Sequence, residues 1–213
     1  AWSFPPSIAN RMDPDEAETW RERGKTWGRF GNWLEAFEEK GLSVNFGSFL
    51  GGSTVREYGM GHAMGDATPE ALAEMRRITA ESMEDGAFGV ATALIYPPNS
   101  YSTTEELIQV MEVVAAYNGV HITHLRSEGD EFVEALEEQL QIARETGVIT
   151  EIYHLKAAGK KNWSKMPEVI DRINAARAKG IDIAADMYPY PGAGTGLAAC
   201  VPPWASADGK LFE

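Results

Sequence analysis

The chain has 213 residues, of which 44% are hydrophobic and 24% are charged. This is the composition of a globular protein, and it is sufficient for one large domain, or part of a larger one, with a buried core. The 19 basic residues are outnumbered by 32 acidic ones, which gives a net charge of −13. Neither nucleic acid nor an anionic membrane is therefore expected as a partner.

Cysteine content and hydropathy bear on the cellular location of the chain. The single cysteine, Cys200, cannot form an internal disulfide, which is consistent with a reducing, cytoplasmic location. No apolar run approaches the roughly 20 residues that a membrane span requires. Because the first residue is Ala1 rather than methionine, we expect the chain to be a fragment or a processed product.

Residues 1–41 are expected to lead into the main fold. Residues 1–24 are rich in proline, tryptophan and charge, which favours a loop with a short helix. Residues 26–40, TWGRFGNWLEAFEEK, predict an aromatic-rich helix.

From residue 39 onward, five polar, helix-like stretches each end in glycine, which tolerates the left-handed conformation that closes a helix. These glycines are Gly41, Gly86, Gly119, Gly147 and Gly180. An apolar run follows each one and predicts a strand, at 42–50, 87–95, 120–125, 148–155 and 181–188. The runs are apolar nearly throughout, as in parallel strands covered on both faces.

Helix starts can also be located in the sequence. Thr68 followed by Pro69 is typical of a helix N-terminus. Ser102 and Glu105 in STTE form a capping-box pattern, and Asp130 is positioned to cap the helix that follows it.

Five strands with four intervening helices are thus predicted between residue 42 and about 188, which indicates a parallel α/β architecture. An open doubly wound sheet has the same period, but a partial (β/α)8 TIM-type barrel is favoured if function lies at the strand ends. We assign residues 1–190 to this partial barrel. Residues 191–213 are assigned to the start of a post-strand loop or an inserted segment. A complete barrel needs at least three more strands.

Two histidines end successive predicted strands. His124 and His154 are 30 positions apart, each followed by leucine, in THLRSEGD and YHLKAAGK. Matching positions on adjacent strands would let both bind one zinc or similar ion. Two hydrogen-bonded structural histidines are an equal alternative. His121 has the opposite strand parity and should point away.

Other polar residues cluster at the same predicted strand ends. Tyr96 and Tyr188 each precede proline, and their phenols could donate to a substrate carbonyl or simply pack at the rim. Arg126 and Lys156, two residues past the histidines, could each bind a carboxylate. For Arg126 an ion pair is equally expected. Asp186 is a candidate acceptor for a loop amide.

Four motifs, ALIYPPNSYSTTEEL, ITHLRSEGD, IYHLKAAGKKNWSK and ADMYPYPGAGTGL, resemble those of the N-acyl-D-amino-acid deacylases (D-aminoacylases) of the amidohydrolase superfamily. The resemblance runs from about Trp27 to Trp204. It implies a metal-dependent (β/α)8 barrel that hydrolyses the amide bond of a small-molecule N-acyl-D-amino acid, giving a carboxylate and a free D-amino acid, with Zn2+ as cofactor.

The resemblance also assigns roles to individual residues. His124 and His154 match the family's zinc ligands, whereas Tyr96, Lys156 and Tyr188 match its substrate-binding residues. The family's first-strand His-x-His, its ligating cysteine and its general-base aspartate have no counterpart, and we expect them before Ala1 and after Glu213.

Local departures and alternatives accompany the resemblance. Gly52 stands where many relatives have histidine, and Gly194 where some have serine. Enzymes of the hydantoinase type carry a lysine that bridges two metals. Residues 88–95 contain no lysine. The alternatives are a cyclic-amide hydrolase of the hydantoinase or dihydroorotase type, and a catalytically silent barrel fragment that serves as a scaffold. Self-association is possible in each case.

Overall fold

The computed structural model describes residues 14–202 and 204–205. Its sheet has five strands in the sequential order β1-β2-β3-β4-β5, and all neighbouring pairs are parallel. The strands are β1 (Leu50–Gly51), β2 (Gly89–Ala93), β3 (Val120–His124), β4 (Ile149–Ile152) and β5 (Ile183–Ala185). The helices between them are α4 (Gly52–Met60), α5 (Pro69–Glu84), α6 (Thr104–Ala116), α7 (Phe132–Thr146) and α8 (Met166–Ala178). The predicted parallel α/β architecture is confirmed.

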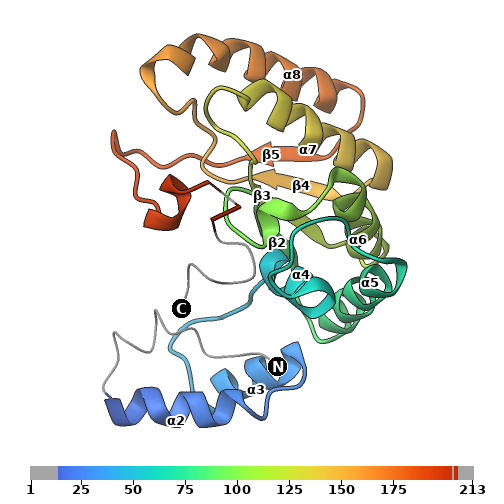
Figure 1. Ribbon diagram of the computed structural model, residues 1–213, viewed down its shortest axis with the longest axis vertical. Coiled ribbons are helices and arrows are strands. Elements are labelled where there is room, and N and C mark those ends of the chain that lie inside the picture. The colour runs from blue at the N-terminus through green and yellow to red at the C-terminus, as the bar shows by residue number, and fades with distance from the viewer. Residues whose placement is uncertain (1–13, 203, 206–213) are drawn as a thin grey trace.

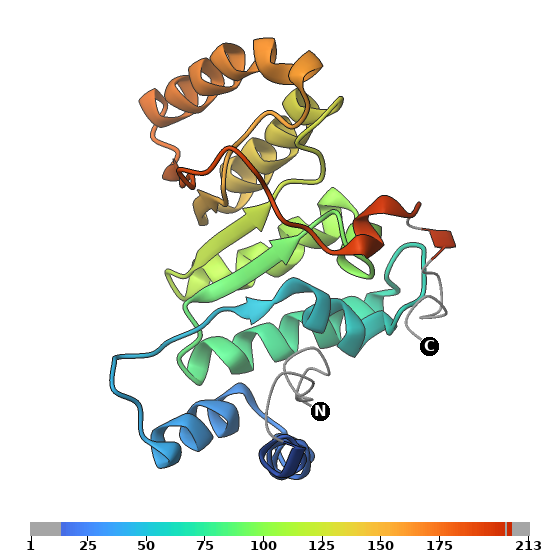
Figure 2. The same cartoon turned by 90° about the vertical axis from the view of Figure 1, so that its left-hand side faces the viewer.

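The remaining elements lie outside this alternation. They are α2 (Pro14–Gly24), α3 (Phe30–Lys40) and three short 3-10 helices at Asn99–Tyr101, Lys160–Lys165 and Leu197–Cys200. Figures 1 and 2 show α5 to α8 following one another along one side of the curved sheet, with α2 and α3 set apart beyond β1. The segment after β5 returns on the side of the sheet away from these helices.

The first strand is much shorter than predicted. Only Leu50 and Gly51 pair with β2, and the apolar side chains of Leu42, Val44 and Phe46 are exposed. Phe46 instead stacks on Phe37 of α3, with ring centroids 5.0 Å apart. Phe46 therefore packs on the aromatic helix rather than extending the sheet.

The number of intervening helices also differs from the prediction. Two helices, α4 and α5, connect β1 to β2, so five helices rather than four separate the strands. The helix α4 starts immediately after β1, with Gly52 as its first residue, and its C-cap is Gly61, a closing glycine that the sequence prediction did not include.

One predicted helix start is correct and two are wrong. Thr68 caps α5 by accepting a hydrogen bond from the Ala71 amide at 3.2 Å. The cap of α6 is Thr103 rather than Ser102, because the Ser102 amide already donates to Asn99 and closes the preceding 3-10 turn. Asp130 does not cap α7; its carboxylate binds Lys161 and Asn162 instead.

The ends of α7 and α6 differ in which residue takes the left-handed backbone conformation. Gly147 ends α7 in the left-handed conformation, with φ of 70°. At the end of α6, however, Asn118 takes the positive φ of 55°, as asparagine can. A Cβ at the neighbouring Gly119 would lie 2.6 Å from the Met83 Cε atom, so Met83 would have to shift to admit a larger residue.

The hydrophobic core has two parts. The first, which we call the N-terminal cluster, comprises Leu50, Val55, Met75, Ile78, Val90, Leu94, Leu107, Val110, Met111, Val114, Ile142 and Val148. The second, the C-terminal cluster, comprises Leu125, Phe132, Ala135, Leu136, Leu140, Ile152, Val169, Ile173, Ala176 and Ile183. Helix α7 contributes to both clusters, through Ile142 and through Phe132, respectively.

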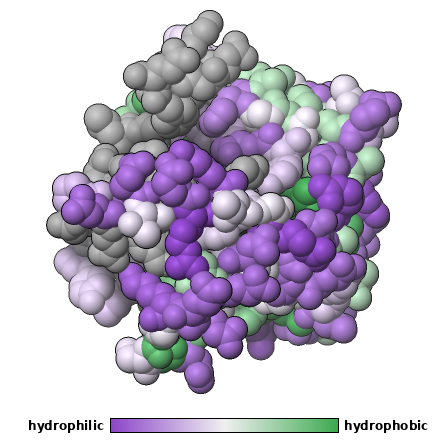
Figure 3. All heavy atoms as spheres, turned by 90° about the horizontal axis from the view of Figure 1, so that it is seen from below, coloured by the Kyte–Doolittle hydropathy of each residue, from purple (hydrophilic) through white to green (hydrophobic). Residues whose placement is uncertain are grey.

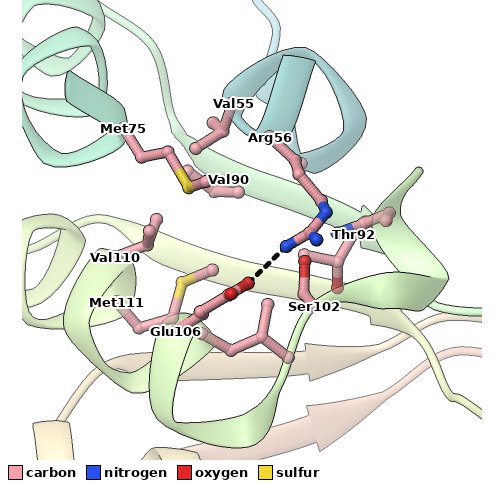
Figure 4. Close-up of a pocket in the computed structure, with 12 residues that line it drawn as sticks. Val55, Arg56, Met75, Val90, Thr92, Ser102, Glu106, Val110 and Met111 are labelled. Atoms are coloured by element: carbon pink, nitrogen blue, oxygen red, sulfur yellow. Dashed lines mark hydrogen bonds and ion pairs between the residues drawn. The ribbon is translucent and has the colours of Figure 1, made fainter. Parts of the chain in front are cut away.

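A buried ion pair lies beside the N-terminal cluster. Arg56 of α4, 1% exposed, contacts Glu106 of α6 at 2.5 Å, as Figure 4 shows. The same guanidinium donates to the Gly65 carbonyl, and Glu106 accepts from the Ala67 amide. The pair thus ties the α4–α5 loop to α6.

The outer surface agrees with the composition. The face in Figure 3 is mainly hydrophilic, with hydrophobic residues in small separate groups. Among the described residues, no helix combines the length and apolarity required to cross a bilayer. The division at residue 190 stays a prediction, and residues 1–13, 203 and 206–213, on which it partly rests, lie outside the described residues.

Candidate metal and substrate site

The two histidines meet at the carboxyl ends of adjacent strands. His124 is the last residue of β3, and His154 follows β4 by two residues. The β3–β4 ladder pairs Thr123 with Ile152, so Tyr153 rather than His154 continues the register opposite His124. The rings of His124 and His154 nevertheless converge, with His124 Nδ1 3.0 Å from His154 Nε2. The predicted orientation of the pair is confirmed.

His154 has an unusual backbone conformation for its residue type. Its φ is 39°, in the left-handed region where non-glycine residues are uncommon. The His154 amide donates to Asp186 Oδ1 at 2.5 Å, just after β5. Asp186 therefore accepts a loop amide, as expected from the sequence, and holds the chain where it turns the second imidazole toward the first.

His121 points to the other face of the sheet, as its strand parity predicts. The ring is completely buried, and its nitrogens lie 3.0 Å from Thr92 Oγ1 and 3.0 Å from Gln139 Nε2 of α7. Burial lowers the pKa of His121 to about 3, so this imidazole is neutral at physiological pH.

Glu128 completes a cluster that sequence reasoning missed. One donor atom from each of His124, Glu128 and His154 can be chosen so that all lie within 4.8 Å of one another. Glu128 Oε1 lies 3.0 Å from His154 Nδ1, and its side chain is 11% exposed. The available signal was an acid four residues after the first histidine, in HLRSE.

The two cations after the histidines have different environments. Arg126 pairs with Glu138 of α7 at 2.8 Å and donates to the Ser100 and Ser102 carbonyls. Its ion-pair alternative is therefore the one observed. Lys156 instead enters the site, with its Nζ atom 2.6 Å from Glu128 Oε1 and 2.9 Å from His154 Nδ1.

A pocket of about 640 Å³ opens over this cluster. The structure brings all five predicted site residues to its wall, which is lined in part by Tyr96, His124, Glu128, His154, Lys156, Tyr188 and Thr195. Its volume is in the range of sites for small molecules. Their placement in one pocket leaves their chemical roles as predictions.

The tyrosines frame the pocket from two loops. The Tyr96 hydroxyl contacts the Thr195 hydroxyl and accepts a hydrogen bond from the Gly196 amide at 3.1 Å. Tyr188 lies against the site, with its ring centroid 6.4 Å from that of His154 and 5.6 Å from Lys156 Nζ. Thr195 and the neighbouring Gly194 both line the wall of the pocket.

The two imidazoles are suited to supply two of the three protein ligands that catalytic zinc usually has. Burial lowers the pKa of His124, reinforced by His154 and Lys156, while Glu128 acts in the opposite direction. The lower pKa favours the neutral imidazole that binds metals. A tetrahedral zinc about 2.05 Å from each nitrogen would hold two nitrogens about 3.3 Å apart, close to the 3.0 Å between His124 Nδ1 and His154 Nε2.

Comparison with known proteins gives consistent relatives. No protein-family model matches the chain. The D-aminoacylase of Alcaligenes xylosoxydans xylosoxydans is 38% identical over 169 residues, which cover 79% of this chain and 35% of that protein. The N-acyl-D-aspartate deacylase of the same organism is 37% identical over 79% of this chain and 34% of its own length. The chain therefore spans about a third of the length of these curated relatives.

A solved structure agrees with the sequence relatives. N-acyl-D-glutamate deacylase from Bordetella bronchiseptica, in complex with zinc and a phosphonate mimic of the tetrahedral intermediate, superposes with a TM-score of 0.74 at 29% identity, covering 76% of this chain and 34% of that one. The five strands and their helices match part of an amidohydrolase barrel. Over the residues compared, the chain belongs to the D-aminoacylase, or N-acyl-D-amino-acid deacylase, family of amidohydrolases.

Proposed function

We propose that this chain forms part of a zinc-dependent hydrolase that cleaves the amide bond of N-acyl-D-amino acids. The observation that carries the proposal is the convergence of two imidazoles, whose nearest nitrogens are 3.0 Å apart. They lie in a pocket also lined by Tyr96, Lys156 and Tyr188. Family membership supplies the reaction class, and the substrate is expected to be a small molecule. A cytoplasmic location stays a prediction.

His124 and His154 are the proposed metal ligands. A zinc ion bound there would polarise the acyl carbonyl and make a bound water more acidic. Neutral imidazole nitrogens are suitable ligands, and the Asp186 contact to the His154 amide holds the backbone from which that ring projects.

The remaining residues of the pocket would bind and orient the substrate. The hydroxyls of Tyr96 and Tyr188 are donors suited to the amide oxygen as charge develops on it. Lys156 Nζ carries three hydrogens, and a substrate carboxylate would replace one of its three present acceptors, which belong to Glu128 and His154. The general base is expected from an aspartate outside this chain, as the family resemblance implies.

The test is zinc content and hydrolysis in the full gene product. His124→Ala and His154→Ala should each lose bound zinc and lower hydrolysis of N-acetyl-D-amino acids by at least 100-fold. His121→Asn is the matched control and should retain its zinc, because that ring faces α7. Zinc retained in both alanine variants would refute the metal site. Turnover of hydantoin in place of N-acetyl-D-amino acids would support the cyclic-amide alternative.

A further inference from the structure

Glu128 contacts the candidate metal site, but it is not one of the two proposed metal ligands. Its Oε1 atom lies 3.0 Å from His154 Nδ1 and 2.6 Å from Lys156 Nζ. Its Oε2 atom is 3.8 Å from His124 Nε2, which is beyond hydrogen-bond distance. One carboxylate oxygen is therefore shared between an imidazole and an ammonium group.

The two nitrogens of His154 face different partners. Nε2 faces His124, and Nδ1 faces Glu128 and Lys156. In a neutral imidazole one nitrogen carries hydrogen and the other carries the lone pair. If Nε2 is to bind a metal, Nδ1 must carry the hydrogen and donate it. A carboxylate can only accept, so Glu128 favours this tautomer.

Lys156 favours the opposite tautomer. Its Nζ atom, 2.9 Å from His154 Nδ1, has hydrogens to donate but no lone pair while it is charged. A hydrogen bond from Lys156 to Nδ1 would place the imidazole hydrogen on Nε2 and block that atom as a ligand. The contact between Glu128 and Lys156 gives the ammonium an alternative acceptor.

We propose that Glu128 is a positioning residue of the candidate metal site, which accepts the Nδ1 hydrogen of His154, keeps the Nε2 lone pair directed at His124, and competes with Nδ1 as the acceptor for Lys156. Glu128 is not a ligand of the same ion, because the nitrogen it contacts is on a different side of the ring from Nε2. This inference rests on the proposed function for the metal and for its two histidine ligands.

Zinc affinity in three variants of the full gene product tests the proposal. Glu128→Gln should weaken zinc binding about 10- to 100-fold, in the range for groups that orient a metal-bound histidine. Lys156→Met should bind zinc as well as the unmodified protein or more tightly. The double variant Glu128→Gln/Lys156→Met should recover most of the lost affinity, because the competing donor is gone. Competition with a chromophoric chelator measures each dissociation constant.

Two further readouts separate positioning from ligation. Long-range nitrogen–proton NMR of the metal-free protein should show the Nδ1–H tautomer for His154, and Glu128→Gln should shift it toward Nε2–H. X-ray absorption should show the same number of zinc ligands in the unmodified protein and in Glu128→Gln. A lost ligand, an unchanged tautomer, or unchanged affinity in Glu128→Gln would each overturn the proposal. Glu128→Asp provides a charged second variant, expected to retain part of the affinity.

A control variant and the histidine variants separate a failure of the Glu128 proposal from a failure of the proposed function. Glu131→Gln removes an exposed carboxylate three residues away and should leave zinc affinity unchanged. If His124→Ala and His154→Ala lose zinc while Glu128→Gln retains it, the role of Glu128 is wrong and the metal site stands. If none of the three variants loses zinc, the proposed function fails as well.

Discussion

At the scale of single residues, His121 links burial to acid sensitivity. Its pKa is lowered to about 3 by burial, whereas an exposed histidine titrates near 6.5. Unfolding therefore takes up a proton below pH 6.5. The stabilising contribution of the neutral ring is complete above that pH and is lost as the pH falls toward 3, by up to about 1.4 kcal/mol per pH unit.

We therefore expect His121→Gln to have a flatter dependence of unfolding free energy on pH between 6.5 and 4 than the unmodified chain. Gln can retain hydrogen bonds to Thr92 and Gln139 without acquiring a proton. Urea titrations at pH 7.5, 5.5 and 4.5 measure the difference, and the other titrating groups cancel between the two proteins. Parallel curves would show that His121 does not contribute to acid unfolding.

Strand parity predicted the histidines but could not predict Glu128. His121 and His124 lie on β3, where alternation assigns opposite faces, and the structure agrees with both assignments. Glu128 lies after the strand, where side-chain direction depends on how residues 125–131 fold. That loop is fixed by contacts distant in sequence, such as the hydrogen bond from the Ala158 amide to the Glu128 carbonyl at 2.7 Å.

At the scale of secondary structure elements, Gly89 sets how closely β2 can approach β3. It begins β2 with φ of 148° and is paired with Val120. A Cβ at this position would lie 1.8 Å from the Val120 carbonyl oxygen, which belongs to backbone and cannot move without disturbing the sheet. Glycine is therefore required here by both conformation and space.

We predict that Gly89→Ala destabilises the chain by more than about 1 kcal/mol, because the strained backbone and the clash add to each other. Gly28→Ala is the matched control: a Cβ there meets no atom of the described residues within 4 Å, so its effect should stay within about 0.5 kcal/mol. Urea unfolding of the two variants makes the comparison. Equal stabilities would mean that β2 and β3 can separate at little cost.

The presence of most strands could be predicted from the sequence, whereas the ends of helices and strands were harder to predict. Glycine punctuation and apolar runs located β2 to β5, because burial on both faces leaves a clear pattern. The cap of α6 moved from Ser102 to Thr103 because the preceding 3-10 turn uses the Ser102 amide. The extent of β1 depended on α3, whose aromatic rings receive Phe46. Neither dependence is local in sequence.

At the scale of the whole molecule, the two edges of the sheet affect behaviour in solution. Among the described residues, β1 and β5 each pair with a single strand. Unpaired edges expose backbone donors and acceptors that can join another chain. The alternation of strands and helices made this sequential topology predictable, since consecutive parallel strands are usually neighbours.

We predict that residues 1–213, produced by themselves, self-associate and show no measurable hydrolysis of N-acetyl-D-amino acids with added zinc. The strands here match only part of the barrel of the relatives, and edge pairing provides the route to association. Light scattering and an amidase assay, with the full gene product alongside, give the result. A monomer that turns over substrate would contradict both the edge argument and the expected location of the general base.

The division of the core between two clusters has a consequence for folding. Each strand pairs only with its sequence neighbours, so contacts accumulate in chain order and the cost of closing long loops is small. The N-terminal cluster contains residues of β1, β2 and α4 to α6, and the C-terminal cluster contains residues of β4, β5 and α8. We expect each of these groups to open as a cooperative folding unit. Because helix α7 carries both Ile142 and Phe132, we expect it to couple the opening of one unit to that of the other.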